Sequence, residues 1–377
     1  MTPSPATVEG LREFKAAKQR QSFLAELNVE RKRRRNGNGP TEPSTSWAPV
    51  DLAAVLRDGC LDEPPQMLAR TDGRCLIYAG KNHVFSGEPE AGKGWAALYA
   101  AAERVRAGEH ALSVDFEDVA TTVAGRMLAL GLDEETIAER FHYVQPSEPL
   151  EGAGWSDLQR ALTAEPTIAI LDGVTEALVL HGLELKDNSD VAKWLALLPR
   201  KLTAAGIAVI QIDHVGRDRE TRGRYALGAQ HKQAGIDAHY GFDVIEPFGR
   251  GLEGRVRIML SKDRYGHVRP HADESKRIAE LRLTSHPNER VEIALEPPST
   301  ESASTFRPTG LMKQVSRAIE DAPGLTKNGI RSAVGGKQDY KDLALELLVA
   351  EGYVKARRDG QAHRHYSIHP YRDDEEA

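Results

Sequence analysis

The 377-residue sequence is poor in cysteine and has no long apolar run. Its two cysteines, Cys60 and Cys75, provide neither a disulfide framework nor a zinc site, which fits a reducing cytoplasm. No apolar run approaches the ~20 residues that a membrane-spanning helix needs. The N-terminus is polar and lacks the apolar segment of a secretory signal. These absences predict a cytoplasmic protein without a membrane partner.

The rest of the composition is that of an ordinary folded protein, with 40% hydrophobic and 28% charged residues. The chain is too long for one small core, so we expect two folded units and tails. Counting Lys and Arg against Asp and Glu, residues 1–50 carry +4, residues 51–305 carry −11, residues 306–372 carry +5 and residues 373–377 carry −4. Any nucleic-acid contact should therefore use the basic ends or particular loops, although solvated surface charge is an alternative for each run.

The hydrophobic pattern in the middle of the chain is that of an α/β domain. Short, nearly continuous apolar strands alternate with helices, which predicts a mainly parallel sheet covered on both faces. The strands that follow residue 235 look antiparallel. The predicted parts are a basic N-terminal helix and flexible linker (1–50), the α/β domain (51–297), a second linker (298–307), a compact C-terminal unit (308–372) and an acidic tail (373–377).

The most specific motif is GEPEAGKG, which starts at Gly87 between an apolar strand and an Ala-rich helix. Its glycines let backbone N–H groups surround an anion, and Lys93 adds a charge for the β- and γ-phosphates. Gly94 stands where a Ser or Thr hydroxyl normally holds Mg²⁺, so a degenerate loop with weak binding or slow turnover is the alternative. The predicted nucleotide-binding residues are Gly87, Glu88, Pro89, Glu90, Ala91, Gly92, Lys93, Gly94 and Trp95.

Polar side chains follow three of the predicted strands. Asp172 ends TIAILD, and its separation from the loop favours an acid that handles Mg²⁺ over a turn cap. Asp115, Glu117 and Asp118 close the strand after the loop helix, where one carboxylate can orient or deprotonate a water unless all three are merely solvated. His214 ends VIQIDH and is either a γ-phosphate sensor or a polar cap. The carboxyl ends of parallel strands meet at one edge, so we expect these groups to face the loop.

The C-terminal unit has the sequence pattern of three helices followed by two strands about a turn at Asp359. This is the layout of a winged helix-turn-helix domain. Basic residues of the unit are candidates for contact with the backbone of duplex DNA, although many domains of this layout bind proteins instead. The candidates are Lys337, Lys341, Arg357, Arg358 and Arg364.

The motifs GEPEAGKG, SVDFED, TIAILDG, VIQIDH, GRYALGAQHK and LSKDRYGHVR make residues 76–295 resemble the RecA-like hexameric ATPases of the DnaB and plasmid RepA helicase type. Within that group the chain looks most similar to RepA-like AAA ATPases of actinobacterial plasmids, integrative elements and phages. Gly94 departs from the family, which has Ser or Thr there. The resemblance implies phosphate binding by Lys93, a catalytic carboxylate at Glu117, Mg²⁺ handling by Asp172, a sensor at His214, and a cross-subunit finger pair at Lys262 and Arg264.

The resemblance also implies self-association, usually into a hexameric ring, and a channel that grips single-stranded DNA. Without it, spacing alone would favour ordinary surface residues at Lys262 and Arg264. The Arg- and Gly-rich stretch after His214 is the candidate for the channel loop, because gripping phosphates needs positive charge and little sequence reading. A solvated loop is the alternative. Its basic residues are Arg217, Arg219, Arg222, Arg224 and Lys232.

These features predict an ATP- and Mg²⁺-dependent motor that acts on DNA, namely a replicative helicase or replication-initiation ATPase of a mobile element. A nucleotide-gated DNA-binding regulator with weak or absent turnover is the first alternative, favoured by Gly94 and the C-terminal unit. Glu117 and the finger pair count against it. A recombination ATPase that forms filaments is a third hypothesis.

Overall fold

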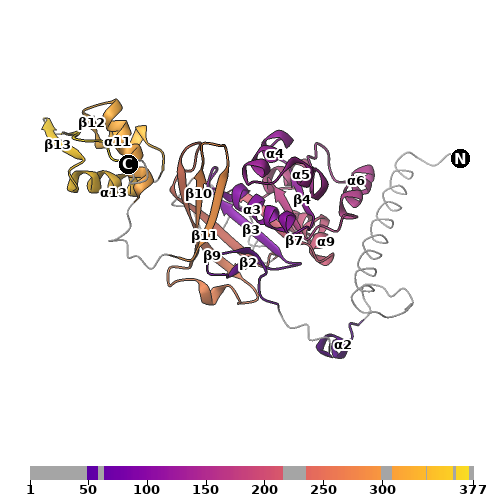
Figure 1. Cartoon of the computed structure of the whole chain (residues 1–377). Helices are drawn as coiled ribbons and strands as arrows, with labels where there is room; N and C mark the ends of the chain where they lie inside the picture. The colour runs from indigo at the N-terminus through magenta and orange to yellow at the C-terminus, as the bar shows by residue number, and fades with distance from the viewer. Residues whose placement is uncertain are drawn as a thin grey trace.

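The computed structural model describes residues 49–57, 63–214, 235–298, 308–336, 338–359 and 362–372. Within them, the largest element is a nine-stranded sheet (Figure 1). Six adjacent strands run parallel, in the order β8 (Ala238–Glu246), β3 (Asn82–Gly87), β7 (Ala208–His214), β6 (Ile168–Asp172), β4 (Ala111–Asp115) and β5 (Phe141–Val144). Beyond β8 the sheet continues with antiparallel pairs through β9 (Glu253–Asp263), β10 (Arg277–Ser285) and β11 (Val291–Glu296).

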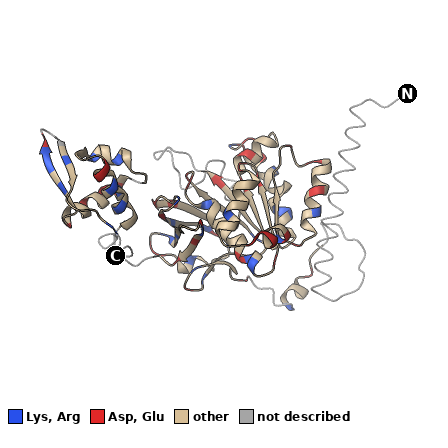
Figure 2. Cartoon of the chain, turned by 45° about the horizontal axis from the view of Figure 1, so that its top comes forward, with Lys and Arg blue, Asp and Glu red and all other residues tan. Residues whose placement is uncertain are grey.

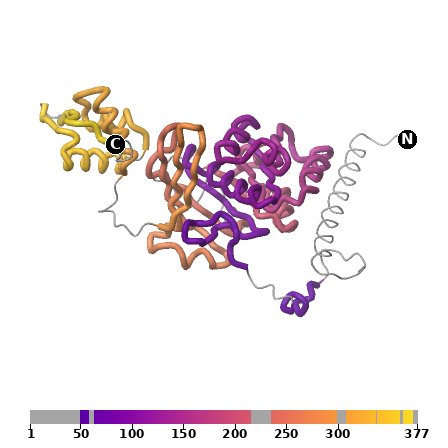
Figure 3. The backbone as a smooth tube through the Cα atoms, in the orientation of Figure 1, coloured from indigo at the N-terminus to yellow at the C-terminus, as the bar shows by residue number. Residues whose placement is uncertain are grey.

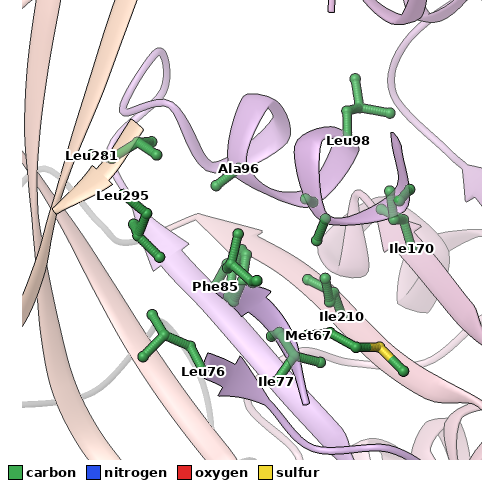
Figure 4. Close-up of a cluster of buried hydrophobic side chains, with 14 of the residues drawn as sticks. Met67, Leu76, Ile77, Phe85, Ala96, Leu98, Ile170, Ile210, Leu281 and Leu295 are labelled. Atoms are coloured by element: carbon green, nitrogen blue, oxygen red, sulfur yellow. The ribbon is translucent and has the colours of Figure 1, made fainter. Parts of the chain in front are cut away.

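The parallel strands are buried on both faces. In β6, Ile168 and Ile170 point to one apolar cluster, whereas Ala169 and Leu171 point to another. This period of two explains why the strand reads as a continuous apolar run, since neither face meets water. Figure 4 shows part of the first cluster, in which Phe85 and Ile210 lie beneath the helix that carries Ala96 and Leu98.

Helices cover the two faces in separate sets. Core residues place three helices on the face of the first cluster: α3 (Lys93–Arg106), α4 (Ala120–Ala129) and α5 (Glu134–Arg140). The opposite face is covered by α6 (Gly152–Leu162), α7 (Val174–Leu180), α8 (Asn188–Leu197) and α9 (Pro199–Ala204). A two-stranded sheet of β1 (Met67–Ala69) and β2 (Cys75–Ile77) precedes β3, and α2 (Leu52–Arg57) lies further upstream.

The predicted mostly parallel α/β sheet is confirmed, with three local differences. The apolar pattern of residues 190–206 predicts one helix, but the structure has two there, because Pro199 has no N–H to continue the ladder of α8. Helix α7 was not expected. Strand β8, expected among the antiparallel strands, is parallel to β3 and antiparallel only to β9.

The C-terminal unit has its own apolar core, which includes Leu311, Val315, Ile330 and Leu348. Figure 3 shows it beside the antiparallel end of the large sheet, where Nη2 of Arg257 donates to Oη of Tyr340 at 2.8 Å. Its elements are α11 (Thr309–Asp321), β12 (Leu325–Thr326), α12 (Lys327–Ala333), α13 (Gln338–Ala350), β13 (Val354–Asp359), and β14 (Ala362–Ser367), which pairs with both β12 and β13.

A search of the described residues for membrane-spanning segments finds no helix of the required length and apolarity.

Candidate nucleotide site

The GEPEAGKG loop joins β3 to α3, and its backbone needs glycine at two positions. A Cβ at Gly87 would lie 2.7 Å from the carbonyl oxygen of Phe242 in the neighbouring strand β8. Gly92 has φ +77°, in the left-handed region, and directly precedes the first residue of α3. The chain thus turns sharply at the carboxyl edge of the sheet and directs the N-terminus of a 14-residue helix at the loop.

Lys93 lies beneath this loop with 4% of its surface exposed. Its Nζ donates to the backbone oxygens of Gly87 at 3.0 Å and Glu88 at 2.7 Å. Burial lowers the pKa of Lys93, and the nearby carboxylates, Asp172 first among them, oppose that shift. The loop therefore holds in place the ammonium that would bind phosphate together with it.

Asp172 and Asp115 end neighbouring parallel strands and are directly paired in register. Asp115 accepts hydrogen bonds from the backbone N–H groups of Glu117 at 3.0 Å and Asp118 at 2.8 Å, which shapes the turn after β4. Burial raises the pKa of Asp172 to about 7, and the charges of Asp115 and Glu117 add to the effect. The edge of the sheet therefore concentrates negative charge beside Lys93.

Glu117 and His214 meet across this edge. Nε2 of His214 lies 3.0 Å from Oε1 of Glu117, and Nδ1 of the same ring lies 3.5 Å from Nζ of Lys93. Gly173, with φ +80°, makes room for the arrangement, because a Cβ there would lie 2.7 Å from Cγ of Glu117. The small residue after Asp172 thus lets the Glu117 side chain approach the end of β6.

One cavity of about 530 Å³ joins these groups. Its lining includes Lys93, Glu117, Asp172 and His214, so the structure brings together four site residues that lie far apart in the sequence. A second cavity of about 980 Å³ shares Trp95, Arg126 and Phe248 with the first. The Trp95 and Phe248 rings pack edge to face, with centroids 5.6 Å apart.

The residues present fit Mg²⁺ only in part. Asp172 offers one carboxylate to the cavity, but Gly94 offers no hydroxyl. Among the described residues there is no group of three or more His, Cys, Asp or Glu side chains placed to hold a metal ion. Asp172 would therefore hold Mg²⁺ together with water and the phosphates of a nucleotide, as octahedral coordination of this ion allows.

Lys262 and Arg264 lie at the opposite edge of the sheet. Strand β9 runs antiparallel to β8, and Ala238 at the start of β8 pairs with Asp263. Nη1 of Arg264 is 3.3 Å from Oδ1 of Asp237, and Nζ of Lys262 donates to the backbone oxygen of Ile236 at 2.7 Å. Neither side chain lines the cavity of Lys93.

Lys341 must be corrected as a candidate for DNA contact. Its side chain is buried, and its Nζ donates to the backbone oxygens of Arg331 and Val334, which caps the end of α12. By contrast, Arg357 and Arg358 lie on the exposed part of β13, where Figure 2 shows basic residues along the strand. Six candidates lie outside the described residues: Arg217, Arg219, Arg222, Arg224, Lys232 and Lys337.

Sequence reasoning missed Arg126 and Phe248. Arg126 comes from α4 and pairs with Asp118 at 3.1 Å, whereas Phe248 follows the end of β8. No motif marks either position. Their approach to the loop depends on how α4 and β8 pack, which the residue pattern does not encode.

Substitutions at the two ends of the loop should have different effects on stability. Gly87→Ala should lower the free energy of unfolding by about 1–3 kcal/mol, because its Cβ meets the backbone of β8. Gly94→Ala should leave it unchanged or raise it by up to about 1 kcal/mol, because the nearest atoms are 3.9 Å away and alanine favours the helix. Urea unfolding of both variants measures the difference, and equal effects would contradict the loop geometry.

The charge at Asp172 should make stability depend on pH. Its folded pKa of about 7 exceeds the ordinary 3.8, so ionisation lowers the free energy of unfolding as the pH rises from about 4 to about 7. Asp172→Asn should therefore be more stable at pH 8, by up to about 4 kcal/mol, and lose that advantage near pH 4. Urea unfolding in EDTA without nucleotide tests this, with exposed Asp157→Asn as the control. An advantage that does not change with pH would refute it.

Residues 49–220 match the family model of an AAA domain. No curated protein matches this sequence. Among solved structures, a KaiC-like protein from the hyperthermophilic archaeon Pyrococcus horikoshii OT3 is similar, with 15% identity and a TM-score of 0.44, over 63% of this chain and 100% of that chain. The AAA-domain match spans the loop, Glu117, Asp172 and His214, and together with the geometry of the loop it supports a P-loop ATPase domain in this part of the chain.

Proposed function

We propose that the protein binds and hydrolyses ATP and uses the cycle to act on DNA. The observation that carries the proposal is the convergence of Lys93, Glu117, Asp172 and His214 on one cavity at the carboxyl edge of a parallel sheet. A phosphate-binding ammonium, a carboxylate for water and an acid for a divalent cation are the groups that phosphoryl transfer requires.

The two adjoining cavities suggest how a nucleotide lies. The triphosphate occupies the cavity of Lys93, where the backbone of the loop and the N-terminus of α3 favour negative charge. The base extends into the second cavity, where Trp95 and Phe248 offer apolar ring surface. Arg126 lies at the junction of the two, since it lines both.

Within this arrangement Glu117 orients the attacking water and accepts its proton. His214 contacts both Glu117 and Lys93, so it can register the γ-phosphate at the ammonium and change the position of the carboxylate. Mg²⁺, when bound, would neutralise charge on the phosphates. The negative charge that develops on the phosphoryl group during transfer needs a further cation. Arg264 of the same subunit does not supply it.

The position of Arg264 supports a site completed by a neighbouring subunit. The finger pair lies at the edge of the sheet opposite to Lys93, so Arg264 reaches a triphosphate only if another copy presents that edge. A head-to-tail arrangement of this kind forms a ring where the rotation closes and a filament where it does not, and we propose a hexameric ring from the resemblance to RepA- and DnaB-like ATPases.

The proposed DNA-acting role is that of a replicative helicase or replication-initiation ATPase of a mobile element. We propose that the C-terminal unit is a winged helix; its three helices and β-hairpin support this, and Arg357 and Arg358 lie on an exposed strand. We propose that it recruits the ring to duplex DNA. Channel loops would grip the single strand.

A nucleotide-gated regulator with little turnover is the second candidate. The observation that favours it is Gly94, which removes the hydroxyl ligand of Mg²⁺ from the cavity. Steady-state ATPase assays with and without single-stranded DNA, beside a mass measurement of the assembly, separate the two. An oligomer with DNA-stimulated turnover supports the motor, and a monomer without turnover supports the regulator.

Mixing two inactive variants tests the shared site directly. Lys93→Ala should abolish ATP binding, whereas Arg264→Ala should keep binding and lose hydrolysis, because it removes only the neighbour's cation. In equal mixtures that exchange subunits, about a quarter of the interfaces combine an intact loop with an intact finger, so about a quarter of the ATPase activity should return.

The control for this experiment is Arg160→Ala, at an exposed position on α6, which should behave as wild type. Full activity of Arg264→Ala at concentrations that sustain the oligomer, or no recovery on mixing, would rule out the cross-subunit finger.

Salt dependence tests the contact of the C-terminal unit with DNA. The double variant Arg357→Ala, Arg358→Ala should weaken duplex binding and reduce the slope of log K against log salt concentration by about 2, since each phosphate contact contributes roughly 0.9. Fluorescence anisotropy over a salt series measures both quantities. Arg160→Ala with Arg200→Ala, both on exposed helix positions remote from the unit, is the matched control. An unchanged slope would favour a protein partner for the unit.

A further inference from the structure

A guanidinium lies where the phosphate loop lacks its hydroxyl. A Cβ at Gly94 would stand 3.9 Å from Nη1 of Arg126 and 3.9 Å from Oδ2 of Asp172. The place of a Ser or Thr side chain is therefore flanked by a cation on one side and the Mg²⁺-handling acid on the other. We propose that Arg126 supplies to the nucleotide's phosphates part of the positive charge that the hydroxyl-held metal ion supplies in other P-loops, so that ATP binds without a divalent cation.

Neighbouring side chains position Arg126 before any ligand arrives. Nη1 pairs with Oδ2 of Asp118 at 3.1 Å, and Cζ lies 5.7 Å from the centroid of the Trp95 ring. The side chain is 33% exposed, so one side remains open to the cavity. A planar guanidinium fixed in this way can donate two parallel hydrogen bonds to a phosphate with little loss of side-chain entropy.

The charges around the cavity favour this role. Among the described residues that line it, Lys93 and Arg126 are the two lysine or arginine side chains, whereas four are acidic: Glu90, Glu117, Asp118 and Asp172. A triphosphate without metal brings further negative charge into a site that is already acidic. Lys93 alone would leave much of that charge unbalanced, and Arg126 is placed to reduce it.

Isothermal titration of ATP into the full chain, in excess Mg²⁺ and in EDTA, tests the inference. The wild-type Kd should differ by less than about threefold between the two conditions, whereas Arg126→Gln should raise the Kd in EDTA by about tenfold or more and change it less in Mg²⁺. Arg126→Lys keeps the positive charge but cannot donate two parallel hydrogen bonds, so its Kd in EDTA should lie between those of wild type and Arg126→Gln. Arg160→Gln is the matched control.

The double variant Gly94→Thr, Arg126→Gln replaces the proposed guanidinium contact with a hydroxyl that can bind Mg²⁺. It restores a hydroxyl next to Asp172 and removes the guanidinium, so ATP should bind well in Mg²⁺ and poorly in EDTA. Thermal unfolding of each variant checks that it is folded. If Arg126→Gln does not fold, two measurements still test the inference: the ratio of the wild-type Kd values in EDTA and in Mg²⁺, and the same ratio for Arg126→Lys.

Two results would overturn the inference. Wild-type protein that binds ATP only with Mg²⁺ would show that Arg126 does not replace the ion. An equal loss of affinity by Arg126→Gln in both conditions would assign Arg126 to the base or to local structure. The inference rests on the proposed ATP site, and wild-type protein that binds ATP in neither condition would refute that site instead.

Discussion

A buried ammonium among carboxylates, at the edge where parallel strands end, is the interaction on which the rest of the site depends. Lys93 is 4% exposed, and burying a charge of this kind is costly unless hydrogen bonds and opposite charges surround it. Loop carbonyls accept from it, and Asp172 lies close enough to oppose the effect of burial on its pKa. The close approach of β8 at Gly87 and the left-handed turn at Gly92 shape the loop that holds it.

Strand direction decides which groups share the site. Strands β3, β4, β6 and β7 are parallel, so the loop, Glu117, Asp172 and His214 meet at one edge although they span well over a hundred residues of sequence. Strand β9 reverses direction and carries Arg264 to the other edge. The same sheet thus gathers the residues of the proposed phosphoryl-transfer site at one edge and places Arg264 at the other, which is the physical basis of the proposed ring.

Arg126 changes the meaning of the glycine at position 94. From the motif alone, Gly94 is a lost Mg²⁺ ligand and an argument for weak activity. In the folded chain the same position lies between Asp172 and a guanidinium that Asp118 and Trp95 hold in place. In the proposed arrangement this group faces the phosphates across the position that a Ser or Thr side chain would occupy. The missing hydroxyl at Gly94 and the proposed contribution of Arg126 from α4 are therefore two features of the same proposed phosphate site.

The residue pattern was sufficient for the α/β class, the mostly parallel sheet and the loop between strand and helix, because apolar periodicity and glycine spacing are local properties. It could not separate Lys341, whose ammonium caps α12, from exposed basic residues, since burial depends on how α13 packs. Nor could it find Arg126. The sequence by itself determined which residues are candidates for phosphate binding and acid chemistry. Only tertiary structure decided which of them face one cavity, because strand direction and helix packing set the distances between them.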